Sequence, residues 1–252
     1  MREPPAAGRG ALHVFADPAA LALAGAARIA AAAAEAIAAR GRFRLVLAGG
    51  DTPRQTYEVL TGPEFVARVD WPRVEFFWGD ERCVPPDDPR SNYRMARESL
   101  LDRVPIVPEN VHRIRGEEDP ARAALEYEER LGGLLPDLVL LGLGVDGHTA
   151  SLFPGLAAVR ERDRRVVAEY VGTVEAWRVT MTPPLLNSAR AVAFLVSGAG
   201  KAGPLRQVLQ GGLPPDLLPA RAIHPASGRL DWLLDAAAAS GLPHVSTHSV
   251  EG

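Results

Sequence analysis

Short apolar runs alternate with longer segments that carry one apolar face along most of this chain. Runs of four to seven residues are the length of strands, whereas apolar positions that recur every three to four residues indicate helices. The predicted strands are residues 12–15, 43–48, 74–78, 112–114, 138–141, 165–171, 178–181 and 191–196. The predicted helices are residues 18–39, 55–60, 92–101, 119–131, 204–209 and 230–235. This alternation predicts an α/β protein.

The alanine-rich segment 18–39 resembles a membrane or signal segment at first sight. Arg28 and Glu35 interrupt it, so no uncharged run reaches the ~18 residues of a membrane span. Asp17 precedes the segment and Pro18 begins it, which is the pattern of a helix cap followed by proline at the first helical position. We therefore expect an amphipathic helix and no membrane association.

The composition limits which binding partners and which cellular compartment we expect. The 252 residues carry a net charge of -3, which provides no field for a polyanion, so nucleic acid is not an expected partner. The single Cys83 excludes an intrachain disulfide and a multi-cysteine zinc site, as in a reducing cytoplasm. No Ser/Pro/Gly-rich linker divides the pattern, so we predict one domain over residues 11–243. Residues 1–10 and 244–252 are expected to be a flexible lead-in and a flexible tail.

The strand at residues 138–141 leads into the turn around which the chemistry is organised. Its polar and flexible residues are Gly142, Gly144, Asp146, Gly147 and His148. Ligands of open α/β sheets bind beyond the carboxyl ends of the strands, which is where this turn lies. A carboxylate two residues from an imidazole can orient it and stabilise its charge, as a general base near neutral pH requires. His148 is therefore a candidate base and Asp146 its partner, although a structural histidine stays open.

Other chemistries fit this turn less well. Its glycines satisfy G-x-G-x-x-G, but Asp146 would place a negative charge beside a pyrophosphate and Pro154 would cut short the required helix. His148 has no histidine partner at the i,i+4 spacing of a metal site, His112 and His224 stand alone, and no G-x-S-x-G elbow supplies a serine nucleophile. If the reaction is a hydrolysis, we expect its nucleophile to be water activated by His148.

Residues 49–52 form a second glycine turn between a strand and a helix. Gly49 and Gly50 let backbone N–H groups approach an anion, and the following helix N-terminus favours negative charge. The turn lacks the Gly-Lys-Ser/Thr ending of a P-loop, which argues against a nucleoside triphosphate. It is either a phosphate cradle or an ordinary turn whose helix is capped by Asp51 or Thr52.

Two further strand ends carry charge. Asp80 and Arg82 follow strand 74–78, where they either face a polar site or form a surface ion pair of about 0 to 1 kcal/mol. Lys201 follows a glycine-rich strand end, where it either meets a phosphate oxygen or is an exposed lysine without a task.

Six blocks of sequence, in order, closely resemble the 6-phosphogluconolactonase family. They are residues 47–53, 78–82, 91–93, 142–154, 178–182 and 197–201. The resemblance implies a cytoplasmic enzyme of the pentose phosphate pathway that hydrolyses 6-phospho-D-glucono-1,5-lactone to 6-phosphogluconate. It also implies a single-domain, mostly parallel Rossmann-like sheet flanked by helices, of the glucosamine-6-phosphate deaminase/ribose-5-phosphate isomerase type. No metal and no organic cofactor is implied, and a monomer or weak homodimer is expected.

The same resemblance implies roles for individual residues. His148 would deprotonate the attacking water and Asp146 would hold His148. Arg82 would lie near the sugar ring or the developing oxyanion, held by Asp80, and Asn92 would bind substrate hydroxyls. The residues implied for the 6-phosphate are Gly49, Gly50, Thr52, Arg178 and Lys201. Asp51 replaces the neutral residue that is common in the family, so we expect it to cap the helix and point away from the phosphate.

Two alternatives remain. Amino-sugar phosphate deaminases and isomerases share the Asp-Gly-His turn, but they have a glutamate five positions after the histidine, where this chain has Phe153. They also have a tyrosine where this chain has Arg82, and both differences favour the lactonase. A non-catalytic sugar-phosphate sensor on the same fold is the other alternative, which the presence of His148, Asp146 and Arg82 together disfavours.

Overall fold

The computed structural model describes residues 10–243 and contains a large parallel sheet and a small antiparallel one. The predicted tail and nearly all of the predicted lead-in lie outside these residues. The large sheet has the order β1 (Ala11–Phe15), β10 (Arg229–Asp235), β9 (Ala191–Val196), β6 (Leu138–Leu141), β2 (Phe43–Leu47), β3 (Val74–Trp78) and β5 (Val111–His112). All of its strand pairs are parallel. The small sheet has the order β4 (Asp80–Arg82), β8 (Ala176–Met181) and β7 (Val166–Val171), and its pairs are antiparallel.

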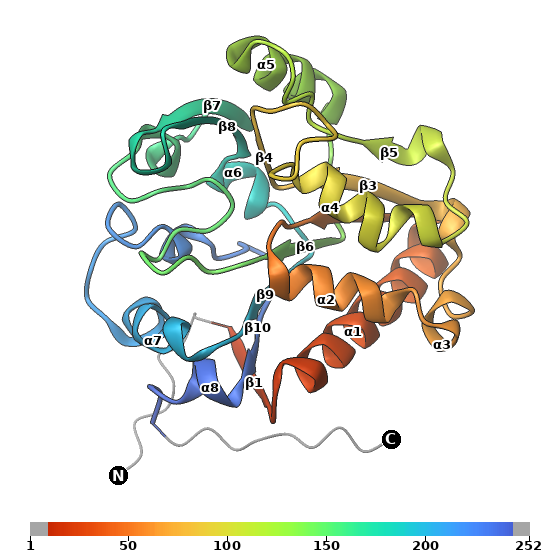
Figure 1. The fold of residues 1–252 in the computed structure, drawn as a ribbon, viewed down its shortest axis with the longest axis horizontal. Helices are drawn as coiled ribbons and strands as arrows, with labels where there is room; N and C mark the ends of the chain where they lie inside the picture. Colours follow the sequence, from red (N-terminus) through yellow and green to blue (C-terminus); the bar gives the residue numbers. More distant parts are fainter. Residues whose placement is uncertain (1–9, 244–252) are drawn as a thin grey trace.

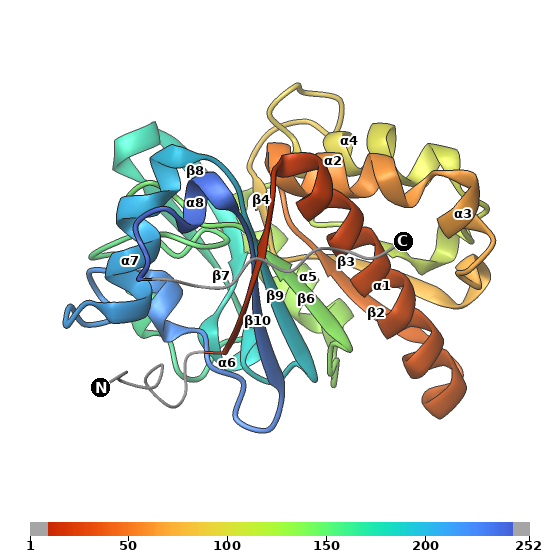
Figure 2. The ribbon, with the colours of Figure 1, turned by 90° about the horizontal axis from the view of Figure 1, so that it is seen from below.

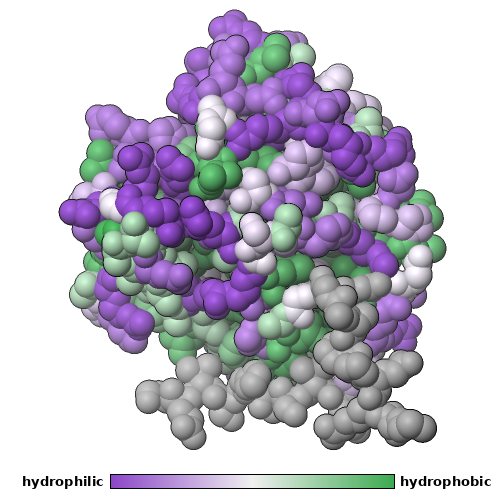
Figure 3. Space-filling model, turned by 180° about the vertical axis from the view of Figure 1, so that it is seen from behind, coloured by the Kyte–Doolittle hydropathy of each residue, from purple (hydrophilic) through white to green (hydrophobic). Residues whose placement is uncertain are grey.

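Helices flank the large sheet (Figures 1 and 2). They are α1 (Pro18–Arg40), α2 (Asp51–Leu60), α3 (Pro63–Val66), α4 (Asn92–Ser99), α5 (Pro120–Leu131), α6 (Pro183–Leu186), α7 (Ala202–Gln210) and α8 (Ala236–Ala239). Short 3-10 turns lie between them: η1 (Trp71–Arg73), η2 (Leu101–Arg103), η3 (Pro108–Asn110), η4 (Ala157–Arg160), η5 (Gly172–Val174), η6 (Ala199–Lys201) and η7 (Pro219–Ala222). In Figure 2, α1 to α4 lie on one side of the strands, and α7, α8 and the small sheet lie on the other. The surface seen in Figure 3 is mainly hydrophilic in its upper part.

The alanine-rich helix α1 is a core helix. The Asp17 side chain caps it by accepting from the N–H of Ala20 at 2.8 Å, as predicted. By length and composition α1 could cross a membrane, and 44% of its most apolar window is buried within the protein. Leu21, Ile29 and Ala33 are buried, and the helix packs on α2 and the large sheet. Small alanine side chains on this face allow close packing.

The helix predicted for residues 230–235 is wrong, because this segment is strand β10. It lies between β1 and β9 and is buried over Leu230–Asp235, so both of its faces are covered. A strand buried on both faces lacks the alternation of apolar and polar positions that marks a half-exposed strand. Asp231 is buried in this strand and forms an ion pair with Arg28.

Two buried tyrosines fix the carboxyl ends of neighbouring strands. The Tyr57 hydroxyl of α2 donates to the carbonyl of Ala48 and accepts from its N–H, both at 3.0 Å. The Tyr127 hydroxyl of α5 does the same for Trp78, at 3.1 and 2.9 Å. Each hydroxyl thus satisfies a backbone donor and acceptor that no neighbouring strand pairs at that point. The loops that follow β2 and β3 therefore start from anchored positions.

Candidate active site

A cleft of about 460 Å3 lies at the carboxyl ends of β2, β3, β6 and β9. The predicted residues that line it are Gly49, Gly50, Thr52, Asp80, Arg82, Asn92, His148 and Lys201. They come from four separate strand–loop junctions, so only the fold brings them together. Asp146 and Arg178 contact lining residues from outside the wall. The roles of all ten as site residues remain predictions.

The imidazole of His148 is held in one orientation. Its Nδ1 lies 2.5 Å from Asp146 Oδ1, and its backbone N–H donates to the same oxygen at 3.1 Å. The Phe153 ring stacks on the imidazole with centroids 4.2 Å apart and an angle of 24°. A carboxylate at Nδ1 favours the tautomer with the proton on that nitrogen, which leaves the Nε2 lone pair free. The arrangement suits an imidazole that accepts a proton through Nε2.

The charge of Asp146 is maintained by the same contacts. Partial burial opposes ionisation, but the hydrogen bonds from His148 and the charge of its ring together hold the pKa of Asp146 below its ordinary value. Asp146 is therefore ionised at neutral pH and can stabilise an imidazolium.

The turn requires glycine where the histidine folds back. A Cβ added to Gly144 would lie 2.1 Å from His148 Nδ1, so only hydrogen fits there. The Gly144 N–H donates to the carbonyl of His148 at 2.8 Å and closes the turn. Gly147 has φ +83°, in the left-handed region that glycine adopts without strain.

Asp80 is buried and is held by residues distant in sequence. Its Oδ2 accepts from the Ser151 hydroxyl at 2.6 Å, and its Oδ1 accepts from Asn92 Nδ2 at 3.3 Å. Among residues 10–243 no ion pair joins Asp80 to Arg82, which excludes the alternative of a surface ion pair and contradicts the expected support of Arg82 by Asp80 through such a pair. Ser151 and Asn92 instead occupy both carboxylate oxygens.

Arg82 and Arg178 lie opposite each other in the register of β4 and β8. Residues opposite each other in antiparallel strands project to the same face of a sheet. Burial first, and the Arg82 charge second, lower the pKa of Arg178 from its ordinary value. The Nε atoms of both side chains are buried without a hydrogen-bond partner in the described structure. Two neighbouring cations with unused donors are the chemistry of an anion site.

Glu81 was not predicted as a site residue, but it organises this wall of the cleft. Its buried carboxylate accepts from the N–H groups of Arg82, Asn92 and Tyr93 at 2.7, 2.7 and 2.8 Å, and from the Ser91 hydroxyl at 3.0 Å. Burial raises its pKa, and the hydrogen bonds from the three backbone N–H groups oppose that shift. The sequence signal was a carboxylate between two charged residues, but its target, the N-terminus of α4, is visible only in three dimensions.

The first glycine turn differs in detail from the prediction. Gly50, with φ +102°, is the N-cap of α2, so the prediction that Asp51 or Thr52 caps the helix is wrong. The Asp51 carboxylate is exposed and forms an ion pair with Arg54 at 3.0 Å. It accepts no capping hydrogen bond from the helix N-terminus. No side chain caps α2, so the backbone N–H groups of its first turn have no side-chain acceptor. These residues line the cleft.

Lys201 is the last residue of η6, which follows β9. Because β6 lies between β9 and β2 in the sheet, Lys201 and the glycine turn after β2 lie on either side of β6. Burial lowers its pKa, and the charge of Asp146 opposes that shift. The Lys201 side chain therefore lies close enough to Asp146 for their charges to interact.

In the part of the chain that the structure describes, no three His, Cys, Asp or Glu side chains are grouped so as to hold a metal ion.

Comparisons with known proteins identify the family of the chain. The profile of the family described as glucosamine-6-phosphate isomerases/6-phosphogluconolactonase matches residues 16–232. The 6-phosphogluconolactonase of Nostoc sp. is 43% identical over 218 residues, which cover 82% of this chain and 88% of that protein. The 6-phosphogluconolactonase of Haemophilus influenzae is 36% identical over 76% of this chain and 84% of its own length.

Solved structures show the same fold. The 6-phosphogluconolactonase from Trypanosoma brucei superposes with a TM-score of 0.84 at 32% identity, over 94% of this chain and 100% of that one. A monomeric glucosamine-6-phosphate deaminase superposes with a TM-score of 0.81 at 23% identity, over 92% of this chain and 99% of that one. The predicted mostly parallel α/β fold of the deaminase type is confirmed.

Proposed function

Since the chain belongs to the glucosamine-6-phosphate isomerase/6-phosphogluconolactonase family, we propose that it hydrolyses 6-phospho-D-glucono-1,5-lactone to 6-phospho-D-gluconate in the pentose phosphate pathway. The observation that carries the mechanism is that His148, which lines the cleft, is held by Asp146 at 2.5 Å.

His148 acts as the general base in this mechanism. Its Nε2 takes a proton from water while the water oxygen attacks C1 of the lactone, which forms a tetrahedral oxyanion. The C1–O5 bond then breaks, and His148 returns the proton to the leaving ring oxygen. Asp146 stabilises the imidazolium between these steps. A positioned base of this kind contributes about 10² to 10⁴-fold in rate.

The cationic residues match the charges of the substrate. Arg82 lines the cleft and, in this proposal, stabilises the oxyanion at C1, a contribution of a few kcal/mol for a preorganised donor. Asn92 has a buried Oδ1 without a partner in the described structure, which suits a substrate hydroxyl as donor. The groups proposed for the 6-phosphate are the uncapped turn at Gly49, Gly50 and Thr52, together with Lys201 and Arg178.

Phe153 distinguishes this activity from an amino-sugar deaminase. Its ring packs on the imidazole where a carboxyl group would be needed to shuttle protons at the sugar carbons. An apolar ring cannot transfer a proton, but it excludes water from one face of the imidazole and fixes the plane of the base.

The decisive experiment compares two reactions of one protein preparation. We expect hydrolysis of freshly generated 6-phosphogluconolactone well above a no-enzyme control, because the lactone also opens spontaneously, and no ammonia release from glucosamine 6-phosphate. His148→Ala should reduce the lactone rate to the spontaneous rate while circular dichroism stays unchanged. Ammonia release, or full lactonase activity of His148→Ala, would refute the proposal.

A monomer or weak homodimer and a cytoplasmic location also belong to the proposal. The single cysteine is consistent with the cytoplasmic location. Light scattering after size-exclusion chromatography measures the first, and fractionation of the native cells measures the second.

A further inference from the structure

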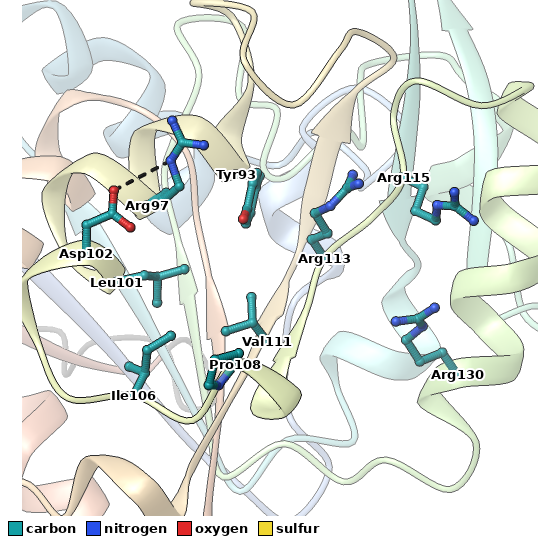
Figure 4. A pocket seen from close by; sticks show the side chains of 10 residues that line it. All are labelled: Tyr93, Arg97, Leu101, Asp102, Ile106, Pro108, Val111, Arg113, Arg115 and Arg130. Atoms are coloured by element: carbon teal, nitrogen blue, oxygen red, sulfur yellow. Dashed lines mark ion pairs between the residues drawn. The ribbon is translucent and has the colours of Figure 1, made fainter.

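A second pocket, of about 370 Å3, lies outside the cleft at the β5 edge of the large sheet (Figure 4). It is lined by Tyr93, Arg97, Leu101, Asp102, Ile106, Pro108, Val111, Arg113, Arg115 and Arg130. These residues come from α4, η2, η3, β5 and the loop after it, and α5. Pockets that bind small molecules span about 300 to 1,000 Å3, so the volume is sufficient for a small organic ligand.

The lining carries four arginines and one carboxylate. Arg97 is poorly paired: its Nε lies 3.6 Å from Asp102, beyond hydrogen-bond distance, and this buried atom has no partner in the described structure. Arg130 makes no ion pair with any residue of the described chain. In Figure 4 these two side chains approach the pocket from α4 and α5, on opposite sides.

The other two arginines are largely neutralised. Arg113 pairs with Glu117 at 2.6 Å, and Arg115 pairs with Glu118 at 2.9 Å. The pocket therefore keeps the positive charge of Arg130 unmatched, whereas Arg97 is matched only by the long ion pair with Asp102 at 3.6 Å. A planar guanidinium with free donors binds phosphate oxygens in bidentate fashion.

The remaining wall is apolar. Leu101, Ile106 and Val111 form one side of it, and the Tyr93 ring lies beneath the Arg113 guanidinium at 5.4 Å. A ligand that fills the pocket would place an apolar or flat body on this wall and its anionic groups against the arginines, above all Arg130, which has no ion pair in the described chain.

We propose that this arginine pocket binds a small phosphate-bearing anion, independently of the catalytic cleft. The two sites are separated by α4, whose first residues divide between them. Asn92 lines the cleft, whereas Tyr93, the next residue, lines the arginine pocket. The proposal does not depend on the reaction at the cleft.

Calorimetric titration of the full chain with inorganic pyrophosphate, and separately with adenosine diphosphate, tests the proposal. The variant Arg97→Gln/Arg130→Gln removes two charges from the pocket. The variant Arg68→Gln/Arg206→Gln removes two charges from exposed positions elsewhere and is the matched control. Lys201→Gln weakens anion binding at the cleft and so identifies the heat that comes from the pocket.

We expect pyrophosphate binding that survives in Lys201→Gln and in the control variant and weakens at least tenfold in Arg97→Gln/Arg130→Gln. If adenosine diphosphate binds more tightly than pyrophosphate, the pocket recognises a ligand with a flat organic body. If the two bind equally, the pocket recognises only the phosphate groups. Binding within twofold of wild type in Arg97→Gln/Arg130→Gln, or no binding that survives Lys201→Gln, would overturn the proposal. If the double variant fails to fold, Arg130→Gln alone, which breaks no ion pair, should weaken binding at least threefold; an unchanged affinity would also overturn it.

Discussion

Replacing Gly144 by alanine tests whether the orientation of His148 drives the reaction. The new Cβ would lie 2.1 Å from Nδ1 and 2.3 Å from Cε1 of the imidazole. Ordinary contact begins at 3.4 Å, so the ring must move from 2.1 to 3.4 Å, by about 1.3 Å. That movement breaks the 2.5 Å contact with Asp146 and the stack on Phe153.

The expected loss in activity follows from the role of the base. We expect kcat/KM to fall by about 10² to 10⁴-fold, as for loss of a general base. This corresponds to about 2.7 to 5.4 kcal/mol of transition-state stabilisation. The free energy of unfolding should fall by much less than this. Overpacking costs about 1 to 3 kcal/mol, and the His148 side chain is 31% exposed and can turn outward, so we expect the low end of that range.

The assay is acid release from fresh 6-phosphogluconolactone, corrected for spontaneous opening, together with a thermal melt. A stability loss of about 1 kcal/mol lowers Tm by about 2 to 4 °C in a protein of this size. Gly133→Ala is the matched control, because its Cβ would meet nothing within 4 Å and it lies after α5, away from the cleft. His148→Ala sets the floor. If Gly144→Ala keeps kcat/KM within threefold of wild type, the orientation of His148 is not what drives the reaction.

Four further predictions follow from named contacts. Glu81→Gln places an NH2 group against donors that now meet a carboxylate, so we expect a loss of about 3 kcal/mol in denaturant unfolding, and a loss below 1 kcal/mol would contradict the network. Lys201→Ala should raise KM for the phosphorylated lactone and leave an unphosphorylated lactone unaffected; equal effects on both would remove Lys201 from the phosphate site. Folding lowers the pKa of Asp146, so its contribution to stability is present above its ordinary value of about 3.9 and is lost as pH falls through the lower folded value. The stability difference between wild type and Asp146→Asn should therefore shrink as the pH falls from ~4 to ~2, and an unchanged difference over that interval would disprove this assignment. Tyr57→Phe removes both hydrogen bonds to Ala48 and should cost about 1 to 3 kcal/mol in the same unfolding experiment, whereas unchanged stability would show that water replaces the hydroxyl.

Several parts of the site could be predicted because their causes are local. The turn after β6 places Asp146 beside His148 through contacts that span two residues, and the glycines that permit it stand in the same segment. Helix starts were equally accessible, since Asp17, Ser91 and Asp119 each accept a hydrogen bond from an N–H three residues ahead.

The errors occurred where local pattern was ambiguous. The segment that forms β10 has continuous apolar residues, which a buried strand and a buried helix share. The N-cap of α2 is Gly50, whose φ is positive. The sequence pointed to Asp51 instead, because aspartate is a common capping residue. In both places a residue's conformation is chosen by what packs around it.

The amino-acid sequence by itself determined that Asp146 lies beside His148, that glycines form the two turns and that strands alternate with helices, because each depends on residues within a few positions of one another. Only the tertiary structure decided which distant groups complete them. Asp80 meets Ser151, 71 residues away, and Arg82 meets Arg178 through the pairing of β4 with β8. The order of strands in a sheet sets such contacts, and that order reflects the burial of whole surfaces rather than any short stretch of sequence.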